Sequence, residues 1–352
     1  MSGFVRRHPF LFYYGLAVSI ASFVWLYIMV METVLANATP GYSLFATFYK
    51  TLAQIREAHP ILHHHSDSVL LYGSTYLVMP VAVAGFFFPF APTLSALITT
   101  SIGWGGRGLA ALLGAYRPVR GAVSAREGMK IYASLIAFIA LAVVCAILRE
   151  QFFGDPSRVA GFLEHLGVID WRYFAATWLV AMFLNQGALL EELGWRGFAL
   201  PVLVRRLGSP LIASIVLGTC WALWHFPREV PVLLTGQETV EKLLIGQALF
   251  ITMCVGMSIV ATYFVNITGG SSIPAIIIHG MLNLIGGMFA VEHVGARTEF
   301  TLQSPLFWAS SAVALLIIVG PDLGWRRRLA AHGGDGSTDP SLVWSGRKGE
   351  SA

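Results

Sequence analysis

Three stretches of this sequence place polar, chemically versatile side chains inside otherwise apolar runs. In chain order, these side chains are Glu191, Glu192, Arg196, His225, His279 and Asn283. Carboxylates and imidazoles can take or give a proton, whereas guanidinium and amide groups can donate hydrogen bonds to a developing negative charge. The set therefore contains a base, an orienting group and oxyanion donors, which are the parts of a hydrolytic site.

The spacing of these residues predicts which of them share a helix face. Glu192 and Arg196 are four residues apart and can pair, while Glu191 projects about 100° away on the same helix. His279 and Asn283 also share a face because they are four apart. Each stretch has a simpler interpretation, as a salt-bridged helix end, an interface histidine or an interhelical hydrogen bond. Their joint presence favours convergence on one polar cavity.

The elements that carry these residues are predicted to be membrane spans. The chain has 352 residues, of which 56% are hydrophobic and 12% are charged, whereas a soluble domain carries about 25% charged residues. The composition predicts an all-α fold, a polytopic transmembrane helical bundle of about eight spans. The apolar runs that define these spans lie near 10–34, 70–103, 130–148, 173–201, 209–226, 243–265, 271–291 and 304–321.

Clusters of basic residues lie on one side of the predicted spans, whereas the loops on the other side hold more mixed charge. The clusters lie at Arg6–Arg7, between Arg107 and Lys130, at Arg205–Arg206 and at Arg326–Arg328. The positive-inside rule therefore predicts that both termini are cytoplasmic. No basic patch is interleaved with aromatic residues, so we expect the lipid bilayer, and no nucleic acid, as a partner. The sequence does not determine the oligomeric state.

The pattern divides the chain into three parts. We expect a first transmembrane helix with an external loop, a core, and a basic anchor with a disordered cytoplasmic tail, at 1–69, 70–325 and 326–352. Within the core, the run 70–103 is too long for one straight span. Its three prolines, Pro80, Pro89 and Pro92, predict a kinked helix or a helix with a re-entrant part.

The order of the three motifs resembles that of a known family. Glu-Glu-x-x-x-Arg, aromatic-x-x-x-His and His-x-x-x-Asn on successive spans are similar to the CPBP family of intramembrane proteases, also called the CAAX prenyl endopeptidase or Abi family. The local sequences EELGWRGFALP, WALWHFP, IIIHGMLN and FAPTLSAL extend the resemblance over roughly residues 85–290. One departure is Trp221, where some members carry phenylalanine.

The resemblance implies a role for each motif residue. Glu191 and His225 would together activate water. His279 and Asn283 would face the oxyanion, and Arg196 would support the carboxylates. The substrate would be a membrane-associated peptide or a lipidated protein, since such proteases clip a C-terminal tripeptide from prenylated proteins in eukaryotes. Bacterial relatives are linked to bacteriocin self-immunity and peptide maturation, so we expect a bacterial plasma membrane protein.

Two questions stay open on the sequence. Glu191, His225 and His279 could hold Zn²⁺ as in a zinc protease, although they lie on three spans and there is no His-Glu-x-x-His. The same polar cavity could also serve a non-enzymatic membrane binding or immunity protein. A proton-coupled transporter using Glu191 and His225 is disfavoured because the chain shows no internal repeat.

Overall fold

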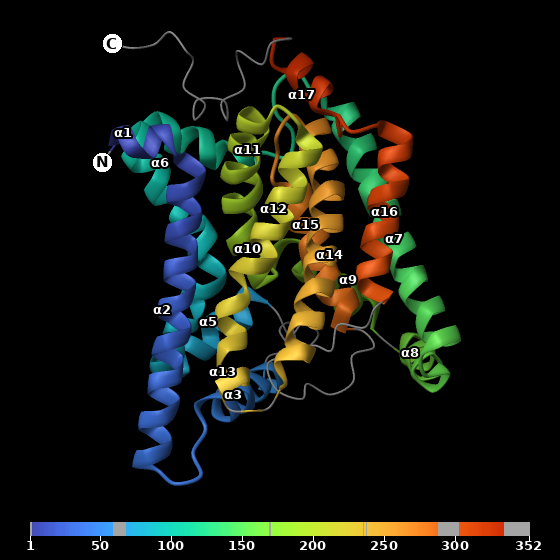
Figure 1. The fold of residues 1–352 in the computed structure, drawn as a ribbon. Helices are drawn as coiled ribbons and strands as arrows, with labels where there is room; N and C mark the ends of the chain where they lie inside the picture. Colours follow the sequence, from blue (N-terminus) through green and yellow to red (C-terminus); the bar gives the residue numbers. More distant parts are fainter. Residues whose placement is uncertain are drawn as a thin grey trace.

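The computed structural model describes residues 2–58, 68–168, 170–234, 236, 238–287 and 303–333, and these are almost entirely helical (Figure 1). In these residues the only extended pairing is an isolated bridge between Ser68 and Asn185. The predicted all-α bundle is therefore confirmed. Most of the predicted C-terminal tail lies outside the described residues.

Five segments of the described part of the chain are long and apolar enough to cross a membrane, and the chain is an integral membrane protein. They are Pro9–Ala38 (α2), Pro80–Tyr116 (η1, Pro80–Phe86; α6, Phe87–Leu113; η2, Gly114–Tyr116), Ala125–Phe153 (α7), Pro210–Glu229 (α12, Pro210–Trp224; η4, Phe226–Glu229) and Val240–Ile267 (α14). Shorter apolar segments lie within α5 (Val69–Val78), α9 (Trp171–Leu184), α15 (Ile273–Gly287) and α16 (Gln303–Val319). The count of eight spans stays a prediction.

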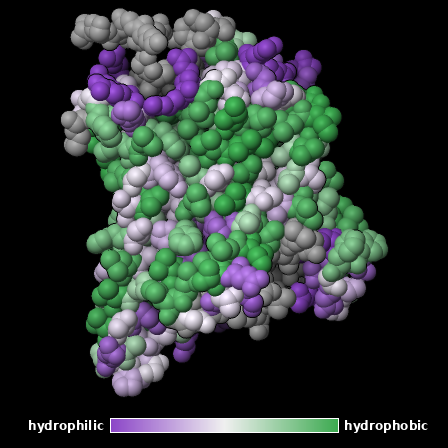
Figure 2. Space-filling model, in the orientation of Figure 1, coloured by the Kyte–Doolittle hydropathy of each residue, from purple (hydrophilic) through white to green (hydrophobic). Residues whose placement is uncertain are grey.

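The remaining helices are short, and most of them lie at the two ends of the bundle. They are α1 (Ser2–Arg7), α3 (Leu44–Ala58), α8 (Pro156–Val168), α10 (Gln186–Glu192), η3 (Leu193–Ala199), α11 (Leu200–Leu207), α13 (Val230–Leu234) and α17 (Trp325–Ala331). In Figure 1, α1, α11 and α17 lie at one end, and α3, α8 and α13 lie at the other. Figure 2 shows hydrophobic residues covering much of the surface between these two ends. Hydrophilic residues gather at the ends themselves.

The long run 70–103 is divided into three helical pieces. Its first helix, α5, stops at Val78, and Pro80 begins η1, because proline lacks the N–H that would continue the helix. Pro92 lies inside α6, which is interrupted instead at Gly105 (φ 60°, ψ −145°). The predicted break is thus present, and Pro80 rather than Pro89 or Pro92 marks it.

Aromatic side chains join the first span to the centre of the bundle. Tyr13 of α2 meets Trp195 of η3 edge to face, with ring centroids 5.6 Å apart. Trp195 in turn meets Trp224 of α12 at 5.8 Å. The Trp224 indole donates a hydrogen bond to the backbone oxygen of Ala17 at 3.2 Å. These contacts hold α2, η3 and α12 together around the helix that carries Glu191.

Candidate active site

The helix that carries the two glutamates begins at a break in the chain. Between α9 and α10, Asn185 is extended (φ −61°, ψ 127°), and its side chain caps α10 by accepting the Ala188 N–H at 3.0 Å. Such a cap satisfies one of the free N–H groups at a helix start. Beyond Glu192 the helix widens into the π-helical turn η3 before α11. Insertions of this kind are frequent at functional sites.

Two glycines allow the surrounding helices to approach this region closely. A Cβ at Gly194 would collide with the backbone of Pro92, which belongs to the FAPTLSAL segment of α6. A Cβ at Gly280 would collide with the backbone oxygen of Ala181 on α9. The absence of side chains at these two positions therefore brings α6 against η3 and α15 against α9, where the motif residues meet.

Glu192 lies at the centre of a buried polar cluster. It is fully buried, and its Oε1 accepts hydrogen bonds from Arg196 Nη1 and His279 Nδ1, each at 2.9 Å. The pairing of Glu192 with Arg196 predicted from their spacing is confirmed. The guanidinium also reaches Ser258 Oγ on α14 at 3.3 Å. Glu192 is thus held by a charged group and an imidazole at the same time.

Glu191 has different surroundings from its neighbour. Its Oε2 accepts the indole N–H of Trp221 at 2.8 Å, and it keeps 4% of its surface exposed. The Glu191 Oε1 and the Asn283 Nδ2 approach each other across Gly187. A Cβ at Gly187 would lie 3.4 Å from the first atom and 3.6 Å from the second. The carboxylate and the amide therefore border the same small space.

Trp221 connects all three motifs. Besides donating to Glu191, its ring lies 5.0 Å from His279, measured between centroids, and 4.9 Å from the Arg196 guanidinium carbon. Its backbone oxygen is 2.9 Å from His225 Nδ1. The sequence pattern assigned Trp221 no role beyond the aromatic position before His225. In the structure it is the residue that contacts Glu191 and both histidines.

His225 lies in an aromatic enclosure near the end of α12. Its ring centroid is 4.6 Å from that of Trp224, 5.1 Å from that of Phe250 and 5.9 Å from that of Phe88. A carbonyl oxygen can only accept, so the contact with Trp221 assigns the proton to Nδ1. In the neutral ring, Nε2 is then left as a proton acceptor.

Asn185 is a site residue that the sequence analysis missed. Its Oδ1 accepts a second hydrogen bond, from Asn283 Nδ2 at 3.0 Å. Asn185 is fully buried, and its own Nδ2 has no hydrogen-bond partner among the described residues. The sequence contained one signal for it, because asparagine is a preferred helix cap and precedes the Glu-Glu helix. This contact fixes which way the Asn283 amide faces.

The structure brings the predicted zinc ligands near one another without making them a metal site. Among the described residues, no three His, Cys, Asp or Glu side chains are placed to hold a metal ion. Glu191 and His225 are both bound to Trp221, and His279 Nδ1 is bound to Glu192. This arrangement does not fit a three-ligand zinc centre. Zinc binding stays a proposal that metal analysis decides.

Comparison with known proteins bears directly on this cluster. Residues 171–285 match the family model of the type II CAAX prenyl endopeptidase, Rce1-like, and all six predicted site residues lie in this range. The chain is also 31% identical over 141 residues to CAAX prenyl protease 2 of Methanococcus maripaludis. That alignment covers 39% of this chain and 49% of the relative, so the chain spans about half the length of the curated relative it matches.

The matched range contains the Glu-Glu-x-x-x-Arg, Trp-x-x-x-His and His-x-x-x-Asn motifs together with the helix cap that positions them. The motif-based recognition is therefore confirmed as a similarity: over residues 171–285 the chain resembles the type II CAAX prenyl endopeptidases of the CPBP family.

Proposed function

We propose that this protein is an intramembrane endopeptidase that hydrolyses a peptide bond of a membrane-associated substrate with water activated by Glu191. The observation that carries the proposal is the unequal environment of two adjacent carboxylates. Glu192 is fully buried and bound to Arg196 and His279. Glu191 keeps one oxygen beside the space that Asn283 also borders. The sequences of the family and of the archaeal relative support the same activity.

Glu191 is the general base in this proposal. A base must lie within hydrogen-bond reach of the water it activates, and the Trp221 N–H orients the Glu191 carboxylate by holding Oε2. Glu192 is a weaker candidate because it is fully buried and its Oε1 is held by both Arg196 and His279. The second oxygen of Glu191 then takes the proton from the attacking water.

Two side chains of α15 face the oxyanion that the attack creates. Asn283 gives one N–H to Asn185, which leaves its second N–H for the substrate oxygen. The Nδ1–H of His279 donates a hydrogen bond to Glu192. Nε2 can therefore donate a hydrogen bond to the oxyanion only when both ring nitrogens carry a proton. Glu192 is the carboxylate that stabilises this charged ring. Donors fixed in advance in a site with little water are effective stabilisers of such a charge.

The proton balance of the reaction closes within these residues. Water oxygen forms a bond to the carbonyl carbon while Glu191 takes one water proton, and the carbonyl electron pair moves onto oxygen. The oxyanion then re-forms the carbonyl as the carbon–nitrogen bond breaks, and the leaving nitrogen takes the proton that Glu191 had accepted. His225 Nε2 accepts a hydrogen bond from the attacking water and later relays this proton from Glu191 to the leaving nitrogen, which returns Glu191 to its carboxylate form.

The substrate class follows from the comparisons as a proposal. We propose a CAAX-type prenylated protein or a bacteriocin-like peptide, and the name of the archaeal relative and the Rce1-like family favour the first. We further propose a bacterial plasma membrane location with both termini cytoplasmic. The single-sided placement of the basic clusters supports this orientation.

The experiment uses the full chain, purified in detergent, with a farnesylated peptide ending in a CAAX sequence. Mass spectrometry follows release of the C-terminal tripeptide, with an unprenylated copy of the peptide and Glu191→Ala protein as controls. We expect cleavage that depends on the lipid and on Glu191. Wild-type protein that binds the farnesylated peptide and a bacteriocin-like peptide but cleaves neither would favour a non-enzymatic binding protein.

A further inference from the structure

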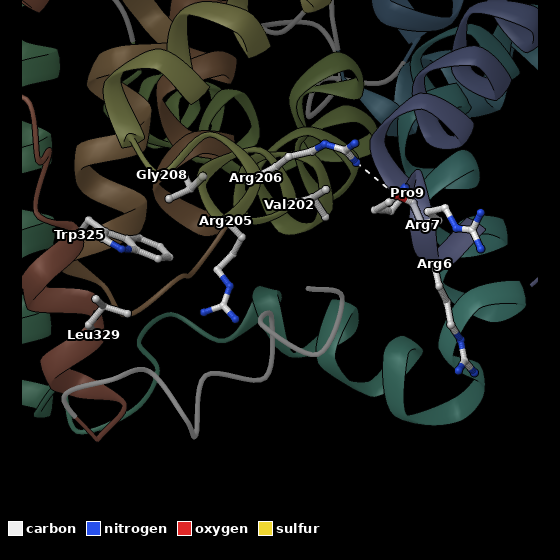
Figure 3. Close-up of a pocket in the computed structure, with 10 residues that line it drawn as sticks. Arg6, Arg7, Pro9, Val202, Arg205, Arg206, Gly208, Trp325 and Leu329 are labelled. Carbon is white, nitrogen blue, oxygen red and sulfur yellow. Dashed lines mark hydrogen bonds between the residues drawn. The ribbon is translucent and has the colours of Figure 1, made fainter. Parts of the chain in front are cut away.

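A separate cavity lies at the end of the bundle where α1, α11 and α17 meet. It has a volume of about 530 Å³, within the range of roughly 300–1,000 Å³ for small-molecule sites. Four of its ten lining residues are arginines, and none of these ten described residues is acidic. The lining consists of Arg6, Arg7, Pro9, Val202, Val204, Arg205, Arg206, Gly208, Trp325 and Leu329 (Figure 3).

Backbone oxygens hold two of these four arginines in place despite their like charges. Arg206 Nη1 donates to the backbone oxygen of Arg7 at 3.2 Å, across 199 residues of sequence. Arg6 Nε donates to the backbone oxygen of Gly103 on α6. Both arginine pairs lie in the last turn of a helix, where the helix dipole favours positive charge. Two distant segments thus place arginines around one concavity, and Figure 3 shows the Arg206 side chain pointing toward the backbone of Arg7 and Pro9.

The surroundings of the cavity are apolar on the side that faces the bundle. Val202 and Leu329 line it, and exposed apolar side chains continue along the neighbouring spans. Leu11 on α2 is 63% exposed, and Ile212 on α12 is 50% exposed. A ligand that matched both features would carry an anionic group and hydrocarbon chains.

We propose that this arginine pocket binds the phosphate headgroup of an anionic phospholipid. Guanidinium groups match phosphate oxygens with paired hydrogen bonds, and basic pockets between membrane helices at one face of the bilayer are suited to such headgroups. The apolar surface below the pocket accommodates the acyl chains. This binding is independent of the proposed peptidase activity.

A topological anchor would also place arginines at this end, and the chain offers a control for it. Arg326 and Arg327 of α17 are exposed at the same end but do not line the pocket. Replacing both by glutamine removes two charges from this end without touching the pocket. If general surface charge were responsible for lipid binding, replacing these two residues would lower lipid retention as strongly as replacing arginines that line the cavity.

Gly208 provides a matched pair of variants that leaves every arginine in place. It lines the pocket in a left-handed conformation (φ 67°), and a Cβ there would meet nothing within 4 Å. Asparagine and aspartate both tolerate this conformation and have the same shape. Gly208→Asp adds a negative charge to the pocket, and Gly208→Asn is its neutral control.

The test is retention of lipid by the full chain, purified in detergent with equal amounts of phosphatidylglycerol and phosphatidylcholine and analysed by native mass spectrometry. We expect wild-type protein, Gly208→Asn and the Arg326→Gln/Arg327→Gln variant to retain phosphatidylglycerol selectively. One charge near the membrane surface is worth about 1 kcal/mol, so Gly208→Asp should retain about fivefold less. An Arg7→Gln/Arg206→Gln variant should lose the selectivity.

Three results would overturn the proposal. One is equal retention by Gly208→Asp and Gly208→Asn together with unchanged selectivity in Arg7→Gln/Arg206→Gln. Another is an equal loss in the Arg326→Gln/Arg327→Gln control, which would mean that surface charge alone is responsible. The last is release of the bound lipid by millimolar inorganic phosphate, which would identify a free phosphate site instead.

Discussion

The membrane-embedded polar cluster and the arginine pocket both gather charge, but they treat it in opposite ways. In the cluster, Glu192 is fully buried and held by Arg196 and His279. In the pocket, four arginines line a cavity that has no acidic residue among its lining side chains. The cluster therefore pairs opposite charges side by side, whereas the described residues that line the pocket carry charge of one sign.

The side chains of the cluster therefore orient one another, whereas the arginines of the pocket attract a charged ligand. Inside the bundle, each hydrogen bond fixes a donor or acceptor relative to its neighbour, so a lost contact should lower turnover. At the end of the bundle, charge is exposed to solvent and acts over a longer range, so a lost charge should change ligand retention. Substitutions in the cluster test this difference between the two regions.

The largest of these effects is expected at the two oxyanion donors. Removal of one such donor typically lowers turnover by about 100- to 1,000-fold, so His279→Ala and Asn283→Ala should each do so while the protein still folds. Peptide cleavage rates measure the effect, and thermal unfolding in detergent checks folding. If both variants kept near-normal turnover, these residues would be structural only.

A smaller effect is expected at Asn185, which positions Asn283 rather than touching substrate. Asn185→Ala removes the acceptor that orients the Asn283 amide, and loss of a net contribution of about 1–1.5 kcal/mol should lower kcat about tenfold. Asn185→Asp keeps an acceptor for both Ala188 and Asn283 and should restore most of kcat.

A double-mutant cycle separates this positioning role from general destabilisation. Adding Asn185→Ala to Asn283→Ala should lower kcat no further, because the residue that Asn185 orients is already absent. A further tenfold loss in the double variant, or equal loss in Asn185→Asp and Asn185→Ala, would show that Asn185 does not act through Asn283.

A still smaller effect is expected at Trp221. Trp221→Phe removes the indole N–H that holds Glu191 Oε2 but keeps a ring beside His279. We expect kcat to fall about threefold, within the range for a single hydrogen bond that is partly replaced, with little change in KM. A rise in KM with unchanged kcat would place Trp221 in substrate binding instead of base orientation.

The smallest effect is expected from removing metal. Because Glu191, His225 and His279 do not form a three-ligand group, protein dialysed against a chelator should keep its cleavage rate. Metal content is measured by mass spectrometry of the same sample. Activity that is lost with chelation and returns in proportion to added Zn²⁺ would establish the zinc centre that the sequence suggested.

Local spacing predicted some contacts of the site, and tertiary packing determined the others. The pairing of Glu192 with Arg196 follows from four residues on one helix. The contact of Glu192 with His279 joins residues 87 apart, and no helical period encodes it. In the sequence, Trp221 looked like any aromatic residue of an apolar helix. Its hydrogen bond to Glu191 could not be predicted, because that contact depends on how α12 packs against α10.

The same distinction holds for the fold. Apolar runs predicted the helices, and the prolines in 70–103 predicted a break, but proline spacing alone could not show that Pro80 would mark it. The cap at Asn185 interrupts a run that looked continuous from 173 to 201. Such interruptions depend on partners from other helices, here Asn283 and the backbone of Ser68.

The most direct test of the account compares Glu191→Gln with Glu192→Gln, since each keeps the shape and removes the basicity of one carboxylate. Cleavage of the farnesylated peptide, binding of the same peptide and thermal unfolding are measured for both. We predict that Glu191→Gln binds peptide and folds normally but does not cleave it, and that Glu192→Gln is milder or fails through stability. A well-folded Glu192→Gln without activity beside an active Glu191→Gln would contradict the assignment of Glu191 as the base.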